Sequence, residues 1–271
     1  MSLLSKLPGI RRYALENERL RAKLTESRRQ VEELRESQAR DAEFLRQARE
    51  YDYYWKEAVK RIDIRQLKPF GEVADRVIRD GKTYLNVDRL YTLWQGVESL
   101  PSTAQAVAEI GVYRGGSAWF LADALRRAGR EMPFYVCDTF QGHVEVDERL
   151  DGLHRPGEQF TRVKAEKVAK YLRGFPFVRM QVGDIRETAP TFAAEKAFGL
   201  VHLDVDVYPI TRYCLDFFGQ RLVPGGTIVM DDYGTTTCEG VKKAVDEFRE
   251  VNRGFRVLHL LTGQAVVMKL Y

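Results

Sequence analysis

The chain has 271 residues, of which 44% are hydrophobic and 30% are charged, and its formal net charge is +4. This ordinary globular composition excludes collagen-like and fully disordered chains. Because 43 Lys and Arg nearly balance 39 Asp and Glu, the charge gives no reason to expect nucleic acid as a partner.

The first segment, residues 1–50, contains a long stretch with the pattern of a coiled coil. Residues 11–50 have no Gly or Pro, and spacings of four and three connect Tyr13, Asn17, Leu20, Leu24, Ser27, Val31, Leu34, Gln38, Asp41 and Leu45. These spacings form a seven-residue (heptad) repeat, with Leu20 and Leu34 at core position d and Leu24 and Val31 at core position a. They predict a helix that pairs with a second copy, and Asn17 at another a position is suited to set the register of the pair. The polar residues at other seam positions leave a solvated single helix as the alternative.

The second segment, residues 51–103, is expected to be a helical cap on the substrate side. Apolar residues at helical spacing between 85 and 97 predict an amphipathic helix. The aromatic cluster at 51–55 suits either a hydrophobic core or the mouth of a substrate site.

The third segment, residues 104–271, alternates strands and helices. Expected strands are 106–111, 134–138, 177–184, 199–206 and 226–232, and expected helices lie near 117–127, 163–173, 210–221 and 239–252. Two further strands, 255–261 and 264–270, are expected to form a hairpin. This order predicts an α/β fold with a doubly wound, mostly parallel sheet and a C-terminal antiparallel hairpin.

The ends of the first three strands suggest a nucleoside ligand. Glycines between 111 and 116 would let a ligand approach the backbone, and the helix that follows offers free N–H groups to an anion. Asp138 is placed to accept ribose hydroxyls, or else caps a turn, and Asp184 follows the third strand. Acidic residues at these strand ends would repel a polyphosphate, and the sequence has no P-loop motif. Both observations favour S-adenosylmethionine as the ligand.

Acidic residues also gather after the fourth and fifth strands. Residues two apart share one face of a strand, so His202, Asp204 and Asp206 are expected to point one way. Asp231 and Asp232 end the next strand. So many neighbouring carboxylates favour a divalent cation, Mg²⁺ first, with Mn²⁺ or Ca²⁺ as alternatives. The competing interpretation is that some of them cap helices.

Several motifs in order resemble the macrocin O-methyltransferase family, which includes the mycinamicin and novobiocin O-methyltransferases. They are EIGVYRGGSAWFLADAL, CDTFQG, VGDIRET, HLDVDVYPITR, PGGTIVMDDY and GVKKAVDEF. The resemblance covers about residues 80–271, and the segment 11–50 is expected to lie outside the family pattern. It implies a class I, Rossmann-like methyltransferase fold, S-adenosylmethionine as donor, Mg²⁺ dependence and a sugar hydroxyl as acceptor.

The resemblance also implies roles for particular residues. The cofactor would contact Glu109, Gly111, Tyr113, Ser117, Asp138, Thr139, Phe140, Gly183, Asp184 and Ile185. The metal ligands would be Asp204, Asp231 and Asp232, and Asp206 would be the general base. His143 is a competing base in a neighbouring loop, and His202 is expected to be structural. Val205 stands where the family often has Gly.

We therefore expect an O-methyltransferase that acts on a sugar of a glycosylated natural product or a polysaccharide. The alternatives are a catechol-type enzyme acting on an aromatic diol and a non-catalytic coiled-coil assembly protein. Three widely spaced cysteines, no apolar run of membrane-spanning length and no signal peptide predict a cytoplasmic protein.

Overall fold

The computed structural model describes residues 16, 19–35, 38, 42, 46, 63–193 and 197–271. The chain divides into two units, Met1–Asp63 and Ile64–Tyr271. Among the described residues, no helix is both long and apolar enough to cross a membrane.

Residues 19–35 of the first unit form one continuous helix, as predicted. Its apolar seam residues are all exposed: Leu20, Leu24, Val31 and Leu34. Pairing of this helix with a second copy stays a prediction. Tyr13, Asn17, Asp41, Leu45 and the aromatic cluster at 51–55 lie outside the described residues.

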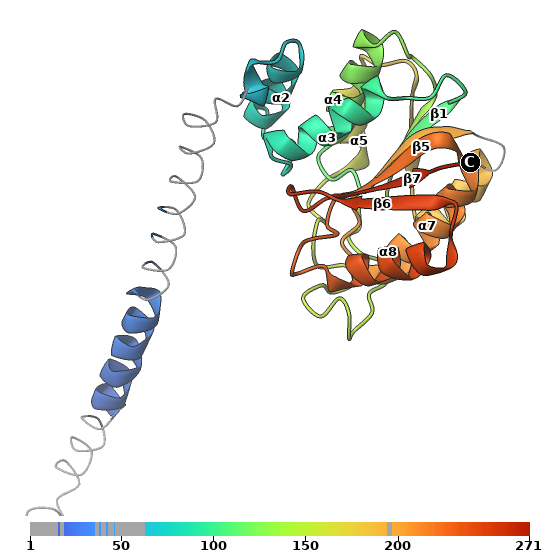
Figure 1. Ribbon diagram of the computed structural model, residues 1–271. Coiled ribbons are helices and arrows are strands. Elements are labelled where there is room, and N and C mark those ends of the chain that lie inside the picture. Colours follow the sequence, from blue (N-terminus) through green and yellow to red (C-terminus); the bar gives the residue numbers. More distant parts are fainter. Residues whose placement is uncertain are drawn as a thin grey trace, which may run out of the picture. The chain divides into compact units, whose positions relative to one another are not determined.

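Seven strands of the second unit form one sheet in the order β3-β2-β1-β4-β5-β7-β6 (Figure 1). The strands are β1 (Ala106–Ile110), β2 (Phe134–Asp138), β3 (Val178–Val182), β4 (Phe198–Leu203), β5 (Leu222–Met230), β6 (Phe255–His259) and β7 (Ala265–Lys269). The first five are parallel, and β7 pairs antiparallel with β5 and β6. The predicted doubly wound sheet and its C-terminal hairpin are confirmed.

Helices cover both faces of this sheet, and each face has its own hydrophobic core. A short 3₁₀ helix, η3 (Ile64–Gln66), precedes the α-helices, which are α2 (Phe70–Arg79), α3 (Val87–Glu98), α4 (Gly116–Arg127), α5 (Ala165–Leu172), α6 (Ile185–Ala193), α7 (Tyr208–Arg221) and α8 (Glu239–Val251). The first core joins apolar residues of α2 to α5, and the second joins those of α6 to α8. Figure 1 shows α3 and α4 on one side of the sheet and α7 and α8 on the other. Strand β1 is buried along its whole length because both faces are covered.

The largest differences from the predicted elements lie around β4. The strand ends at Leu203, three residues earlier than expected, and the chain then turns through Asp206, whose φ is 60°. Strand β5 runs from Leu222 to Met230, so it starts four residues earlier and ends two residues earlier than the expected strand 226–232. Helix α6 was not predicted, since Gly183 before it and Pro190 within it both suggest a break in helical structure.

The site-bearing loops all leave the sheet at the carboxyl ends of its parallel strands. The longest is the connection 139–164 between β2 and α5, which consists of turns and bends. Such loops are where open α/β sheets bind ligands.

Candidate active site

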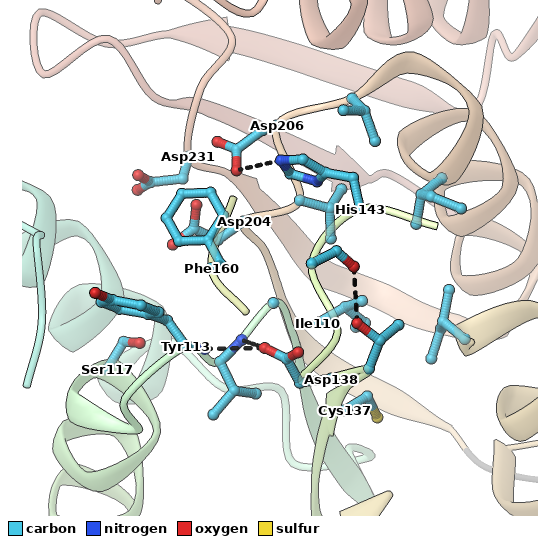
Figure 2. Close-up of a pocket in the computed structure, with 18 of the residues that line it drawn as sticks. Ile110, Tyr113, Ser117, Cys137, Asp138, His143, Phe160, Asp204, Asp206 and Asp231 are labelled. Carbon is cyan, nitrogen blue, oxygen red and sulfur yellow. Dashed lines mark hydrogen bonds and ion pairs between the residues drawn. The ribbon is translucent and has the colours of Figure 1, made fainter. Parts of the chain in front are cut away.

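One cavity opens at the carboxyl ends of β1, β2, β4 and β5, and most of the predicted site residues line it (Figure 2). They are Gly111, Tyr113, Ser117, Asp138, Thr139, His143, Gly183, Asp184, Ile185, Asp204, Asp206, Asp231 and Asp232. In the view of Figure 2, Asp204, Asp206 and Asp231 group together, apart from Asp138. Of the predicted residues, Glu109 and Phe140 do not line the cavity.

Gly111 is needed for a reason that differs from the predicted one. Its φ is +86°, and a Cβ atom there would lie 1.7 Å from the carbonyl oxygen of Asp204. The Asp204 N–H also donates to the Ile110 carbonyl at 2.9 Å. A side chain at 111 would therefore push away the backbone that carries Asp204, whereas the sequence had suggested close approach of a ligand.

Asp138 fixes the turn that follows β1. One carboxylate oxygen accepts the N–H groups of Val112 at 2.7 Å and Tyr113 at 2.9 Å, and the other accepts that of Phe140 at 2.6 Å. The Phe140 side chain packs against the first hydrophobic core. Asp138 thus faces the cavity with its orientation set by three backbone donors, which suits a group that must present an acceptor to a ribose.

Asp184 is held by the arginine two residues along. Arg186 donates to it from Nε at 3.1 Å and from Nη2 at 2.6 Å, and Arg186 also pairs with Glu145. Burial alone would raise the pKa of Asp184, but the hydrogen bonds and charge of Arg186 lower it. Asp184 is therefore an ionised and rigid part of the cavity wall.

The structure places Glu109 beneath the cavity instead of in it. Its carboxylate is fully buried and lies 2.9 Å from Nδ1 of His202, whose Nε2 lies 3.8 Å from Asp231. Burial by itself would lower the pKa of His202, but the negative charges of Asp231 and Glu109 and the hydrogen bond with Glu109 raise it to about 10. The buried His202 ring therefore lies between Glu109 and Asp231, and the structural role expected for it stays a prediction.

Three carboxylates meet at one wall of the cavity. Ligand oxygens of Asp204, Asp231 and Asp232 lie within 4.8 Å of one another, and Asp206 forms a similar group with Asp232 and Cys238. Burial and then the neighbouring acids raise the pKa of Asp204 and of Asp206 well above the ordinary range. Oxygen donors that repel one another in a largely buried site fit a hard divalent cation, which would lower the pKa values of both Asp204 and Asp206.

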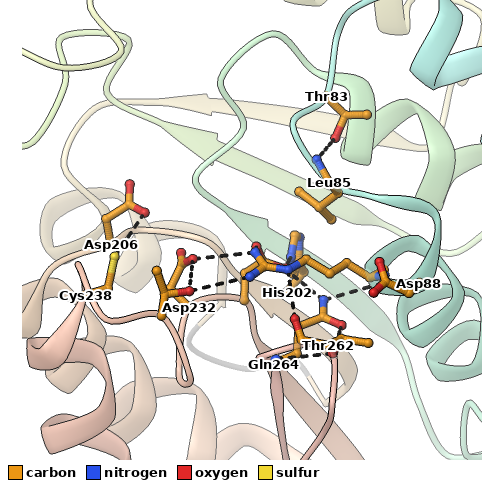
Figure 3. A network of polar contacts seen from close by, with 12 residues as sticks. Thr83, Leu85, Asp88, His202, Asp206, Asp232, Cys238, Thr262 and Gln264 are labelled. Atoms are coloured by element: carbon orange, nitrogen blue, oxygen red, sulfur yellow. Dashed lines mark hydrogen bonds and ion pairs between the residues drawn. The ribbon is translucent and has the colours of Figure 1, made fainter. Parts of the chain in front are cut away.

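Sequence reasoning missed two side chains that partner this acidic group. Arg89 of α3 donates from Nη1 to Asp231 at 2.5 Å, and the same nitrogen lies 3.6 Å from Asp232. Gln264, in the turn before β7, donates to the other oxygen of Asp231 at 2.8 Å (Figure 3). Burial would raise the pKa of Asp231, but His202, Arg89 and Gln264 hold it below the ordinary range. No local sequence motif links Arg89 or Gln264 to Asp231, because each lies on an element that is far from β5 along the chain.

His143 comes to the same wall from the loop after β2. Its Nε2 lies 3.8 Å from Asp206 without a hydrogen-bond partner, and its ring packs edge-on against His154 and Phe160 (Figure 2). Burial and then the nearby His154 lower the pKa of His143 to about 4, so its ring is neutral at neutral pH. Both predicted proton acceptors, Asp206 and His143, therefore lie side by side.

The amino-acid sequence matches a family described as macrocin-O-methyltransferase over residues 18–267. This range includes most of the N-terminal helical segment, so the expectation that residues 11–50 lie outside the family pattern is wrong. Two curated relatives are similar over 62% of this chain. The 8-demethyl-8-(2,3-dimethoxy-alpha-L-rhamnosyl)-tetracenomycin-C 4'-O-methyltransferase of Streptomyces olivaceus is 29% identical over 67% of its own length. The mycinamicin III 3''-O-methyltransferase of Micromonospora griseorubida is 30% identical over 70% of its length.

Solved structures show the same architecture. The O-methyltransferase NovP is 26% identical, with a TM-score of 0.59 over 70% of this chain and 82% of NovP. The calicheamicin methyltransferase CalS11 is 20% identical, with a TM-score of 0.54 over 77% of this chain and 97% of CalS11, and shares the fold.

Proposed function

The chain belongs to the macrocin O-methyltransferase family and is an O-methyltransferase, and we propose that it transfers the methyl group of S-adenosylmethionine to a sugar hydroxyl with the help of a divalent cation. The observation that carries this proposal is the convergence of Asp204, Asp231 and Asp232 on one wall of the cavity whose other wall carries Asp138 and Asp184. The non-catalytic assembly protein considered as an alternative is not supported by this family membership.

The donor-binding end of the cavity has the polar groups that S-adenosylmethionine needs. Asp138 offers carboxylate oxygens to the ribose hydroxyls, and Ser117 in the first turn of α4 offers a hydroxyl and helix N-terminal N–H groups to the amino-acid carboxylate. Gly183, Asp184 and Ile185 border the place where an adenine ring would lie. When bound, S-adenosylmethionine supplies a methyl group already activated by its sulfonium.

The acidic wall would hold the cation through Asp204, Asp231 and Asp232. Mg²⁺ suits this set because all three ligands are carboxylates, and it would lower the pKa of a bound hydroxyl. The contribution of the chain is to bring the three carboxylates together and to orient Asp231 through its hydrogen bond from Gln264.

The acceptor would enter beside the base. Asp206 lies next to the proposed metal ligands at the cavity wall and would take the proton of the acceptor hydroxyl, and the neutral His143 ring lies 3.8 Å away. Tyr84, Val144 and Phe160 are all exposed at this cavity and offer apolar surface to a sugar ring or to the group that carries it. The name of the Streptomyces olivaceus relative describes a rhamnosyl group on its substrate, which supports a sugar as the acceptor here.

A methyl-transfer assay tests the proposal. Purified full-length protein would be incubated with isotopically labelled S-adenosylmethionine and either rhamnosylated polyketides or a simple catechol, and the products analysed by mass spectrometry. We expect a labelled methyl group on the sugar, no activity in excess EDTA, and recovery when Mg²⁺ is restored. Full activity in EDTA would exclude the metal, and labelling of the catechol alone would favour the aromatic diol as acceptor.

We also propose that the N-terminal helix makes the protein a homodimer. Four exposed apolar side chains follow its heptad seam: Leu20, Leu24, Val31 and Leu34. Arg29 pairs with Glu26 and Glu33 on the same helix, which supports the helix in solution. The cytoplasmic location expected from the sequence stays a prediction.

A further inference from the structure

Arg89 extends from helix α3 to the acidic wall of the cavity, which is formed by Asp204, Asp231 and Asp232. Its neighbours Leu90 and Leu93 are completely buried in the core, so α3 has little freedom to shift. The Nε of Arg89 donates to the Thr262 carbonyl oxygen at 3.2 Å. The side-chain amide of Gln264 donates to the Arg89 carbonyl oxygen at 3.5 Å (Figure 3). These contacts fix the backbone of Arg89 and direct its guanidinium group into the cavity.

The guanidinium lies between two of the three predicted metal ligands. Nη1 contacts Asp231 Oδ2 at 2.5 Å and lies 3.6 Å from Asp232 Oδ1. The other oxygen of Asp231 accepts the hydrogen bond from Gln264. Both oxygens of Asp231 are thus already engaged, although the same carboxylate has ligand geometry with Asp204 and Asp232.

A divalent ion and this guanidinium cannot share Asp231 and Asp232 without cost. A Mg²⁺ or Mn²⁺ ion needs carboxylate oxygens at about 2.0–2.2 Å, which uses the lone pairs that Arg89 now occupies. Two cations on the same pair of buried carboxylates also repel each other strongly, because the screening there is weaker than in water. One of them must move, and the arginine side chain has the rotatable bonds to do so.

We propose that Arg89 is a resident cation of the acidic wall, which neutralises Asp231 and Asp232 while no divalent ion is bound and must release them when one binds. This inference rests on the proposed metal site. It makes Arg89 a positioning residue that sets the affinity for the metal and couples metal binding to the α3 side of the cavity.

Binding of Mn²⁺ alone tests the inference without any enzymatic readout. Full-length protein freed of metal would be titrated with Mn²⁺, and the free ion followed by its electron paramagnetic resonance signal. We expect Arg89→Gln and Arg89→Met to bind Mn²⁺ at least about tenfold more tightly than the wild type, because the competing charge is gone. Arg89→Lys, which keeps that charge, should stay closer to the wild type. Metal-free Arg89→Gln should melt at a lower temperature and regain more stability from Mn²⁺.

Arg130→Gln is the matched control. Arg130 is also a half-buried arginine, but it donates to the carbonyls of Leu100 and Pro101, so its loss should leave Mn²⁺ affinity unchanged. Equal or weaker Mn²⁺ binding by both Arg89→Gln and Arg89→Met would overturn the inference while leaving the metal site intact. If neither the wild type nor these variants bind Mn²⁺, the metal proposal itself fails and the inference with it.

Discussion

Asp206 has surroundings that suit a proton acceptor better than a metal ligand. It lies beyond the end of β4 in a left-handed conformation with φ of 60°, close to His143 and Cys238. Burial and then Asp232 and Asp231 raise the pKa of its carboxyl, which increases its affinity for a proton. Asp204 instead continues the line of the strand and faces Asp231 and Asp232.

We expect Asp206→Asn to lower kcat about 10²- to 10⁴-fold, because the amide cannot accept the acceptor proton. Binding of S-adenosylmethionine, measured by calorimetry, should change little, since Asp138 and Ser117 would make the donor contacts. His143→Gln is the comparison and should lose much less activity. A larger loss in His143→Gln than in Asp206→Asn would assign the base to His143.

At the scale of elements, the site depends on how closely the ends of β1 and β4 approach each other. The N–H of Asp204 bonds to Ile110 at 2.9 Å, and Gly111 leaves no room for a side chain next to the Asp204 carbonyl. Strand ends that pack this tightly carry both the loop proposed to bind the donor and the first of the proposed metal ligands. A change in one strand end must therefore disturb both binding functions.

Gly111→Ala is expected to cost about 2–4 kcal/mol of stability, because it combines a positive φ with a collision against backbone. Thermal unfolding measures this loss. The variant should also bind Mn²⁺ more weakly, since the Asp204 backbone has to move. Gly129→Ala provides the control, because its φ is also positive but nothing lies within 4 Å of the added atom. Equal losses in both variants would show that strain alone, without the collision, explains the effect.

At the scale of the whole molecule, the catalytic unit Ile64–Tyr271 has complete hydrophobic cores on both faces of its sheet, whereas the helix at 19–35 has an exposed apolar seam. An amphipathic helix gains most of its stability by burying such a seam. The family match beginning at residue 18 shows that this segment is a shared part of the family, not an addition peculiar to this chain.

Charged substitutions in the seam test self-association. We expect Leu24→Lys with Val31→Lys to convert a dimer to a monomer in sedimentation measurements, because two copies would bury like charges against each other. Thr25→Lys with Glu32→Lys places two lysines at the neighbouring b positions, outside the a/d seam, and should leave the dimer intact. A monomeric wild type at micromolar concentration would contradict the dimer proposal.

The sequence by itself determined the alternation of strands and helices, the C-terminal hairpin and the acidic residues at the strand ends. These follow from local signals: short apolar runs, helical spacing and polar residues immediately after a strand. It also placed Asp204, Asp231 and Asp232 near one another, because adjacent parallel strands end at the same edge of a sheet.

Only the tertiary structure decided what surrounds those acids. Glu109 is buried against His202, Asp206 lies in a left-handed turn after β4 and not on the strand, and Arg89 contacts Asp231 across 142 positions of the chain. The direction of a side chain and its distant partners depend on how helices pack against the sheet, and no local pattern of residues encodes that packing.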